Sequence, residues 1–135
     1  HVDSDLLEDY SDLPEGVSIY EISGPLFFAS AKQYSGVIKE IGLKSKILII
    51  RMRHVPFVDS TALHNFAEMI KTLQKSDVKV LLSGVGDSVL EDLKRHEITS
   101  LIGNENILNS FDAAVKYAKR VINEIEYTKL KADLL

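Results

Sequence analysis

Four short apolar runs alternate with amphipathic helical patterns, and this order most constrains what the chain can fold into. The strand-like runs, rich in β-branched residues, cover residues 17–22, 47–52, 78–82 and 107–108. A helical pattern follows each run, beginning near residues 30, 62, 87 and 110. Strands that are separated by helices pair in parallel, because each helix carries the chain back across the sheet. We therefore expect an α/β fold: a small mixed or parallel sheet of about four to five strands, mixed at its start, with about four helices.

The clearest strand and helix lie in the middle of the chain. Residues 47–52 are typical of a central strand that is buried on both faces. Arg51 and Arg53 are predicted to mark the point where this strand emerges into solvent, and Pro56 then ends the ladder. The helix that follows has its apolar residues at i, i+3 and i+4 spacing: Leu63, Phe66, Ala67, Ile70 and Leu73.

The composition narrows the classes of function. The chain has 135 residues, 45% of them apolar, which is enough for one domain with its own core. Cysteine is absent, which excludes disulfides, thiol nucleophiles and thiolate metal sites. The formal net charge is -4 and no basic stripe is visible, so we expect no nucleic-acid partner. The four histidines lack the spacing of metal ligands, so we expect no metal site.

Catalysis and membrane insertion are also not expected. Ser60 lies near His64 and Asp59, but no Gly-x-Ser-x-Gly nucleophile elbow is present, and we expect neither catalytic residues nor an enzyme. The longest strongly apolar run, residues 47–50, is far shorter than the about 20 residues of a membrane span. We therefore expect this piece to be soluble, and because the chain begins with His1 rather than Met, we expect it to be part of a longer protein.

Three parts are predicted along the chain. Residues 1–16 form an acidic linker or N-terminal arm, with six Asp or Glu residues and no Lys or Arg before Gly16. Residues 17–126 form the folded domain, and its last helix is expected to turn apolar residues inward as far as Ile125. Residues 127–135 form a C-terminal tail.

Asp59, Ser60 and Thr61 follow the central strand and open the next helix. One interpretation is structural, because Asp59 or Ser60 can accept a hydrogen bond from the first helical turn. The other is functional, because loops at the carboxyl ends of strands in α/β sheets are where ligands and partners bind. Phosphorylation of a hydroxyl there would add a charge of about -1.5 to -2. Both interpretations remain open, and we predict a phosphorylation or partner loop.

A second loop, with Gly84, Gly86, Asp87 and Ser88, lies between a predicted strand and a predicted helix. Such a position can bind phosphates, so the loop is a candidate contact for a nucleotide or a partner. The alternative is a tight turn in which Asp87 or Ser88 caps the helix, with Ser88 and Glu91 as a capping box. The GxxxxGK[ST] and GxGxxG patterns of strong nucleotide sites are absent from the sequence.

The segment "VPFVDSTAL", with its preceding apolar strand and following amphipathic helix, resembles the STAS domain of anti-sigma factor antagonists. In that family the loop reads Asp-Ser-Ser-Gly, and a kinase phosphorylates the second hydroxyl residue. The matching position is Thr61. The sequence departs from the family pattern twice, because Thr61 replaces Ser and Ala62 replaces Gly.

A second segment, "VSIYEISGPLFFASAKQY" at residues 17–34, is similar to the start of the STAS domains at the C-terminus of SulP anion transporters. In those domains a strand leads into Gly-x-Leu, an aromatic residue and a segment such as Phe-Ala-Asn-Ala. Here Ser30 replaces the usual Asn. The resemblance runs from about Val17 to Ala118, and it implies the STAS fold.

The resemblance also implies a function. The chain would be a non-catalytic regulatory and interaction domain of a carrier of sulfate or similar anions, at the cytoplasmic face of the plasma membrane. Its partner would be the transmembrane domain of that transporter, with a kinase or acyl carrier protein as further candidates. The resemblance suggests one ligand, a weakly bound nucleotide, and no cofactor is expected. The alternative is a free anti-sigma factor antagonist that is switched by phosphorylation at the Asp59-Ser60-Thr61 loop.

Overall fold

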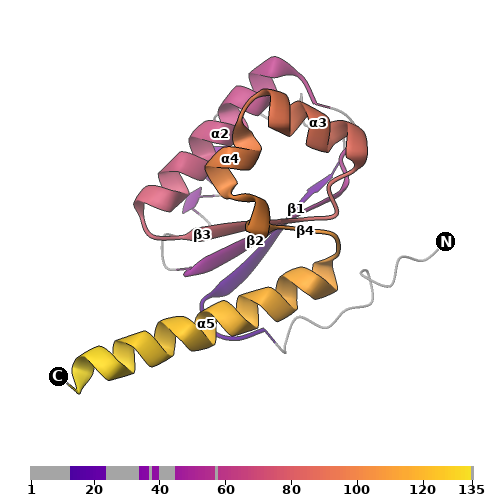
Figure 1. Cartoon of the computed structure of the whole chain (residues 1–135). Coiled ribbons are helices and arrows are strands. Elements are labelled where there is room, and N and C mark those ends of the chain that lie inside the picture. The colour runs from indigo at the N-terminus through magenta and orange to yellow at the C-terminus, as the bar shows by residue number, and fades with distance from the viewer. Residues whose placement is uncertain (1–12, 24–33, 37, 40–44, 57, 135) are drawn as a thin grey trace.

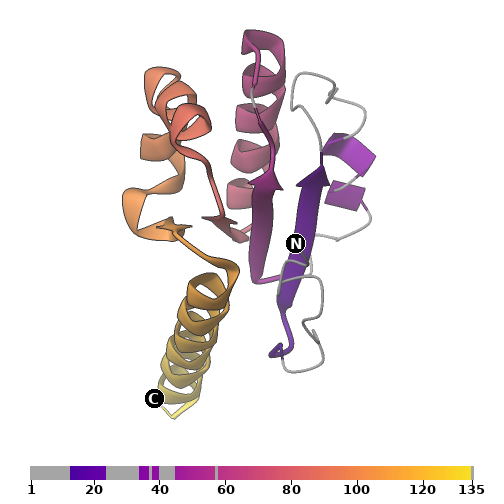
Figure 2. The same ribbon diagram turned by 90° about the vertical axis from the view of Figure 1, so that its right-hand side faces the viewer.

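A parallel sheet of four strands organises the molecule. The structure is a computed structural model that describes residues 13–23, 34–36, 38–39, 45–56 and 58–134. The strands are β1 (Val17–Ser23), β2 (Ile47–His54), β3 (Lys79–Ser83) and β4 (Ile107–Leu108). They lie side by side in the order β1-β2-β3-β4, and each neighbouring pair is parallel (Figure 1, Figure 2). The predicted α/β class is confirmed, and β1 pairs in parallel rather than in the mixed arrangement expected at the start.

Four α-helices and one 3₁₀ turn accompany the strands in the part of the chain from residue 45 onward that the structure describes. The helices are α2 (Ser60–Lys75), α3 (Asp87–Arg95), α4 (Ile98–Ile102) and α5 (Phe111–Asp133), and the turn η4 covers Asn104–Asn106. The sequence pattern did not predict α4 or η4. Part of the helix predicted to begin near residue 30 is described, since residues 34–36 and 38–39 are helical, and the rest of that prediction lies outside the described residues.

The strand order explains how the helices divide between the two faces of the sheet. Crossovers between parallel strands are right-handed, so a sheet that grows in one direction places its connecting helices on one face. In agreement, α2, α3 and α4 cover one face (Figure 1). Because α5 follows the last strand and makes no crossover, it is free to cover the opposite face.

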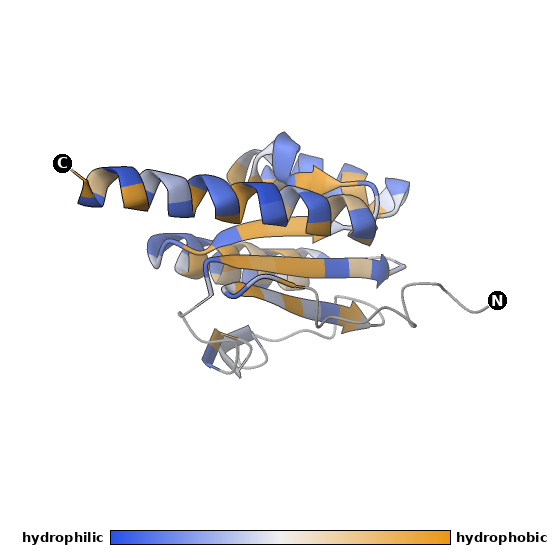
Figure 3. Cartoon of the chain, turned by 90° about the horizontal axis from the view of Figure 1, so that it is seen from below, coloured by the Kyte–Doolittle hydropathy of each residue, from blue (hydrophilic) through white to orange (hydrophobic). Residues whose placement is uncertain are grey.

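Alternating residues of β2 supply both cores. Leu48, Ile50 and Met52 pack in the larger core, together with the buried side of α2, α3 and α4. Ile47 and Ile49 point the other way and pack against α5. Both sets are at most 1% exposed, which confirms that β2 is the central buried strand, and Figure 3 shows its apolar character along most of its length.

Helix α5 is longer than the sheet that it covers. Its 23 residues span about 34 Å, whereas the eight residues of β2 span about 26 Å. Its buried positions end at Ile122, and Ile125 is 37% exposed rather than turned into the core as predicted. The helix continues to Asp133 and reaches past the sheet (Figure 1).

Candidate functional site

The Asp59-Ser60-Thr61 loop lies at the N-terminus of α2, after the central strand. Asp59 is the N-cap, with an extended backbone at φ -116° and ψ 170°. Its Oδ1 accepts a hydrogen bond from the backbone N–H of Ala62 at 2.8 Å. This contact satisfies one of the donors that the first helical turn leaves without an intrahelical partner. The structural interpretation of the loop is therefore confirmed for Asp59.

The same loop is accessible from outside. Asp59, Ser60 and Thr61 are all exposed, whereas Ala62 and Leu63 directly after them are buried. The two hydroxyl residues begin α2 at its positive end. A phosphate on either hydroxyl would be attracted by that end of the helix and repelled by Asp59. Chemically, the loop can carry a new charge at the surface without a change in the packing beneath it.

The Gly84 loop connects β3 to α3, and its cap differs from the prediction. Gly86 is the N-cap of α3, and no side chain in the described part of the chain caps that helix. The predicted capping box of Ser88 and Glu91 is therefore wrong. Asp87 and Ser88 are instead the first two residues inside the helix, where the Asp87 carboxylate meets the positive helix end. Gly84 has a φ of +71°, which glycine adopts without strain.

Both loops follow neighbouring parallel strands, so both lie at the carboxyl edge of the sheet. β2 and β3 are in register, with Arg51 opposite Ser83. Gly84 approaches β2 so closely that an added Cβ would lie 3.1 Å from the Cβ of Arg53. The structure thus places the two predicted loops at the edge where α/β sheets bind ligands and partners.

The prediction that β2 emerges into solvent at Arg51 and Arg53 is wrong for Arg51. Arg51 is 1% exposed and does not emerge into solvent. It shares the strand face of Ile49, and its guanidinium carbon lies 3.9 Å from the centre of the Phe111 ring. The Oε1 of Glu21 lies 2.8 Å from Nε of Arg53 and 4.0 Å from Nε of Arg51. The prediction was wrong because Phe111 and Glu21 are distant in sequence, and only the fold brings them to Arg51.

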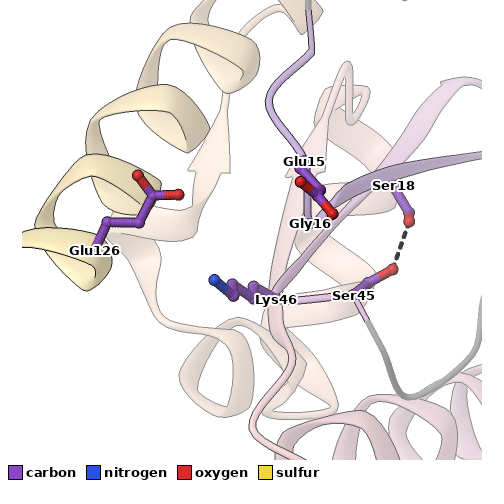
Figure 4. A pocket seen from close by; sticks show the side chains of 6 residues that line it. All are labelled: Glu15, Gly16, Ser18, Ser45, Lys46 and Glu126. Carbon is purple, nitrogen blue, oxygen red and sulfur yellow. Dashed lines mark hydrogen bonds between the residues drawn. The ribbon is translucent and has the colours of Figure 1, made fainter. Parts of the chain in front are cut away.

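A polar cavity of about 430 Å³ lies at the opposite, amino edge of the sheet. Figure 4 shows Lys46 extending from the start of β2 toward α5, which carries Glu126. Ser18 and Ser45 share a hydrogen bond of 2.5 Å on the other side. The remaining lining residues are Glu15 and Gly16. No continuous motif predicts this cavity from the sequence, because its residues come from three separate segments.

The cavity lies between the end of the N-terminal arm and α5. The carbonyl of Gly16 accepts hydrogen bonds from the backbone N–H groups of Lys46 at 2.7 Å and Ile47 at 3.0 Å. These bonds fix the point at which the chain enters the sheet. Within the described residues, no group of three or more His, Cys, Asp or Glu side chains could hold a metal ion.

Comparison with known proteins identifies the class. A family model for the STAS domain matches residues 12–114, and the chain therefore belongs to the STAS domain family. This result confirms the resemblance drawn from the two sequence segments. A four-stranded parallel sheet with helices on both faces agrees with that assignment.

Solved structures of sulfate transporter family proteins are similar to this chain. A sulfate transporter family protein from Wolinella succinogenes is 36% identical, with a TM-score of 0.77 over 86% of this chain and 99% of that chain. The STAS domain of a SulP transporter from Vibrio cholerae is 35% identical, with a TM-score of 0.75 over 84% of this chain and 89% of that chain.

Curated relatives are also sulfate transporters. High affinity sulfate transporter 1 from Stylosanthes hamata is 39% identical over 74 residues, which cover 54% of this chain and 11% of the transporter. The chain thus spans only a small part of the relatives that it matches. The alternative of a free anti-sigma factor antagonist is not favoured by these matches. Among the described residues, no helix is long and apolar enough to cross a membrane.

Proposed function

We propose that the chain is the cytoplasmic regulatory and protein-interaction domain of a SulP-type transporter of sulfate or a similar anion. The observation that carries this proposal is the match to a sulfate transporter family protein and to a SulP transporter STAS domain, over most of this chain and most of theirs. The chain covers 11% of a sulfate transporter, so the membrane part that moves the anion would lie outside it. The domain has no catalytic role in this proposal.

The carboxyl edge is the part of the domain that we assign to regulation. Ser60 and Thr61 are exposed at the start of α2, and Asp59 holds that start in place through its bond to Ala62. Six residues of α2 are buried in the core, so a partner that contacts this loop would meet a rigid structure. We assign the Asp59-Ser60-Thr61 loop as the contact for the transmembrane domain or for a regulator such as a kinase or acyl carrier protein.

The Gly84 loop extends the same contact surface. It lies at the carboxyl edge beside β2, and Asp87 and Ser88 are exposed there. Titration with GTP or ATP, followed by amide chemical shifts, tests whether this surface also takes a nucleotide. Shifts confined to residues near Asp59 and Gly84 would assign a nucleotide site, and unchanged shifts would leave the surface to protein partners.

Sulfate uptake by the intact transporter tests the assignment of the Asp59-Ser60-Thr61 loop. Thr61→Glu places a negative charge at the position where we predict phosphorylation, at a helix N-terminus that tolerates it. We expect the uptake rate per molecule at the membrane to change by about fivefold or more, the scale of coupling between two sites. The matched control is Thr72→Glu, the same substitution at an exposed position far along α2. Equal effects of the two substitutions would contradict the proposal.

A further inference from the structure

A second pocket lies at the amino edge of the sheet, at the turn from the end of α2 to the start of β3. Its volume is about 300 Å³, and residues of α2, β3, α4 and η4 line it. It shares no lining residue with the cavity beside α5. This amino-edge pocket is also remote from the carboxyl-edge loops, because parallel strands separate the two edges.

The amino-edge pocket contains a buried hydrogen-bond acceptor that lacks a donor. Asn106 of η4 lines the pocket and is 5% exposed. Its Nδ2 donates a hydrogen bond to the carbonyl of Ile102 at 2.7 Å. Its Oδ1 is buried and accepts no hydrogen bond from the described residues. Because an unsatisfied buried acceptor costs stability, a donor group that a ligand placed against Asn106 would supply the missing bond.

Two other side chains of the pocket also present acceptors. Gln74 donates its Nε2 to the carbonyl of Leu101 at 2.9 Å, which leaves its Oε1 to accept a hydrogen bond. Asp77 comes directly after the C-cap of α2, and its carboxylate is exposed beside the pocket. The oxygens of Asn106, Gln74 and Asp77 therefore require donors from a ligand.

The charges around the pocket favour a cation. The pocket lies at the C-terminal end of α2, which is the negative end of the helix dipole. Lys79 lines the pocket but shares the strand face of Leu81, and its Nζ lies 6.0 Å from the centre of the Tyr117 ring on α5. Its ammonium group is thus on the other face of the sheet. Lys75, in the last turn of α2, does not line the pocket, so the carboxylate of Asp77 sets the local charge.

We propose that the amino-edge pocket binds the guanidinium group of an arginine side chain from a partner protein. A guanidinium is a planar cation with five N–H donors, which suits the acceptors of Asn106, Gln74 and Asp77. The methylene stem of the arginine would lie against the apolar lining that Val80 and Ile102 supply. A lysine ammonium fits less well, because it is a compact charge with three donors that do not lie in one plane. The site is separate from the carboxyl-edge surface, so the inference does not depend on the proposed function.

Titration of the 135-residue chain with the tripeptide acetyl-Gly-Arg-Gly-amide, followed by amide chemical shifts, tests the inference. We expect saturable shifts around Asp77 and Asn106 at millimolar peptide. The same peptide with citrulline in place of arginine keeps the shape of the side chain without its charge, and it should bind about tenfold less tightly. No saturable shift, or equal affinity for the two peptides, would overturn the inference.

The side-chain amide of Asn106 gives its own signal, so this buried residue can be followed without a substitution. A donor at its Oδ1 should shift that signal as the arginine peptide saturates the pocket. An unchanged signal would show that the guanidinium does not reach Asn106 and would overturn the inference.

Asp77→Asn tests the charge of the pocket. Asparagine tolerates the left-handed backbone of this position, whose φ is +62°, so the variant should fold as the unaltered chain does. We expect it to bind the arginine peptide about tenfold less tightly. The matched control is Glu105→Gln, the same change of carboxylate to amide at an exposed residue that precedes Asn106 but does not line the pocket. Equal weakening in the two variants would assign the effect to net charge and would overturn the inference.

Free arginine distinguishes a partner protein from a small molecule as the source of the guanidinium group. It carries the same side chain, with an ammonium and a carboxylate in place of the neighbouring peptide groups. Tighter binding of the tripeptide than of free arginine would support a partner protein. Tighter binding of free arginine would assign the pocket to a small molecule and would overturn the partner as the source.

Discussion

The guanidinium group of Arg51 lies against the ring of Phe111, with 3.9 Å between the guanidinium carbon and the ring centre. This contact joins the second half of β2 to the first turn of α5. Arg51 is buried, and the carboxylate of Glu21 lies at 4.0 Å from its Nε. A cation that is desolvated against an aromatic ring can contribute about 2 kcal/mol. The pair therefore helps to fix α5 on its face of the sheet.

Arg51→Ala should destabilise the domain strongly. The substitution removes a packed side chain and leaves Glu21 with one cation fewer, so we expect a loss of about 3 kcal/mol in the free energy of unfolding. Urea denaturation measures it. Lys71→Ala is the control, because Lys71 is exposed and its ion pair with Glu68 at 3.7 Å should contribute less than about 1 kcal/mol. Equal losses in the two variants would contradict the structural role of Arg51.

The stability that the Asp59 cap gives α2 can be distinguished from the effect of the negative charge of Asp59. Asp59→Ala removes the acceptor for Ala62 and should lower the free energy of unfolding by about 1 kcal/mol. Asp59→Asn keeps an oxygen at the same position and should restore most of that loss without the negative charge. Thermal denaturation of both variants checks the prediction. A loss in Asp59→Asn as large as that in Asp59→Ala would assign the effect to charge instead.

Serine substitutions at Gly84 and Gly86 should have different effects on the stability of the domain. Gly84 has a φ of +71°, and an added Cβ would lie 3.3 Å from the backbone nitrogen of Arg53, so Gly84→Ser should destabilise by about 1–3 kcal/mol. Gly86 is the N-cap of α3, and no heavy atom lies within 4 Å of an added Cβ. Gly86→Ser should be neutral or slightly stabilising, because serine is a favoured cap. Denaturant midpoints compare the two, and a similar loss in both would contradict the geometry.

Tyr34 should make the domain sensitive to high pH. It is 3% exposed, and burial, followed by the nearby Tyr20, raises the pKa of its phenol above the ordinary value. In the unfolded chain the phenol loses its proton near pH 10, as a free tyrosine does at about that value. The folded state keeps the proton, so its stabilising contribution is present below about pH 10 and is lost as pH rises.

Tyr34→Phe isolates this effect. Above about pH 10 the unaltered chain should lose about 1 kcal/mol more per pH unit than the variant. Near neutral pH the variant should be as stable or slightly more stable, because the buried hydroxyl of Tyr34 has no hydrogen-bond partner among the described residues. Urea denaturation at neutral and alkaline pH measures both. Parallel pH profiles for the two proteins would contradict the raised pKa.

Local patterns predicted the parts of the structure that depend on neighbours in sequence. The buried strand β2, the amphipathic helix α2 and the cap at Asp59 follow from periodicity and residue type within about ten positions. The carboxyl-edge position of the Asp59 loop then follows from the parallel order of strands. The role of that loop stays a prediction, because exposure and capping geometry do not identify what binds to it.

The features that the sequence did not reveal depend on distant contacts or on short elements. The environment of Arg51 is set by Phe111 and Glu21, which the sheet and α5 bring to it. Helix α4 has five residues, which is too short to show a helical period. Ile125 continues the apolar pattern of α5, but the sheet ends before it.

Thiol accessibility at position 61 tests most directly whether the Asp59-Ser60-Thr61 loop contacts the rest of the transporter. The chain has no cysteine, so Thr61→Cys and the control Thr72→Cys each introduce a single reactive group into it. The alkylation rate is measured in the isolated chain and in the intact transporter, whose other cysteines are replaced. We predict that alkylation of Thr61→Cys slows by about tenfold in the intact transporter, a contact of about 1.4 kcal/mol, while Thr72→Cys is unchanged. Equal rates for Thr61→Cys in the two proteins would contradict a contact at this loop.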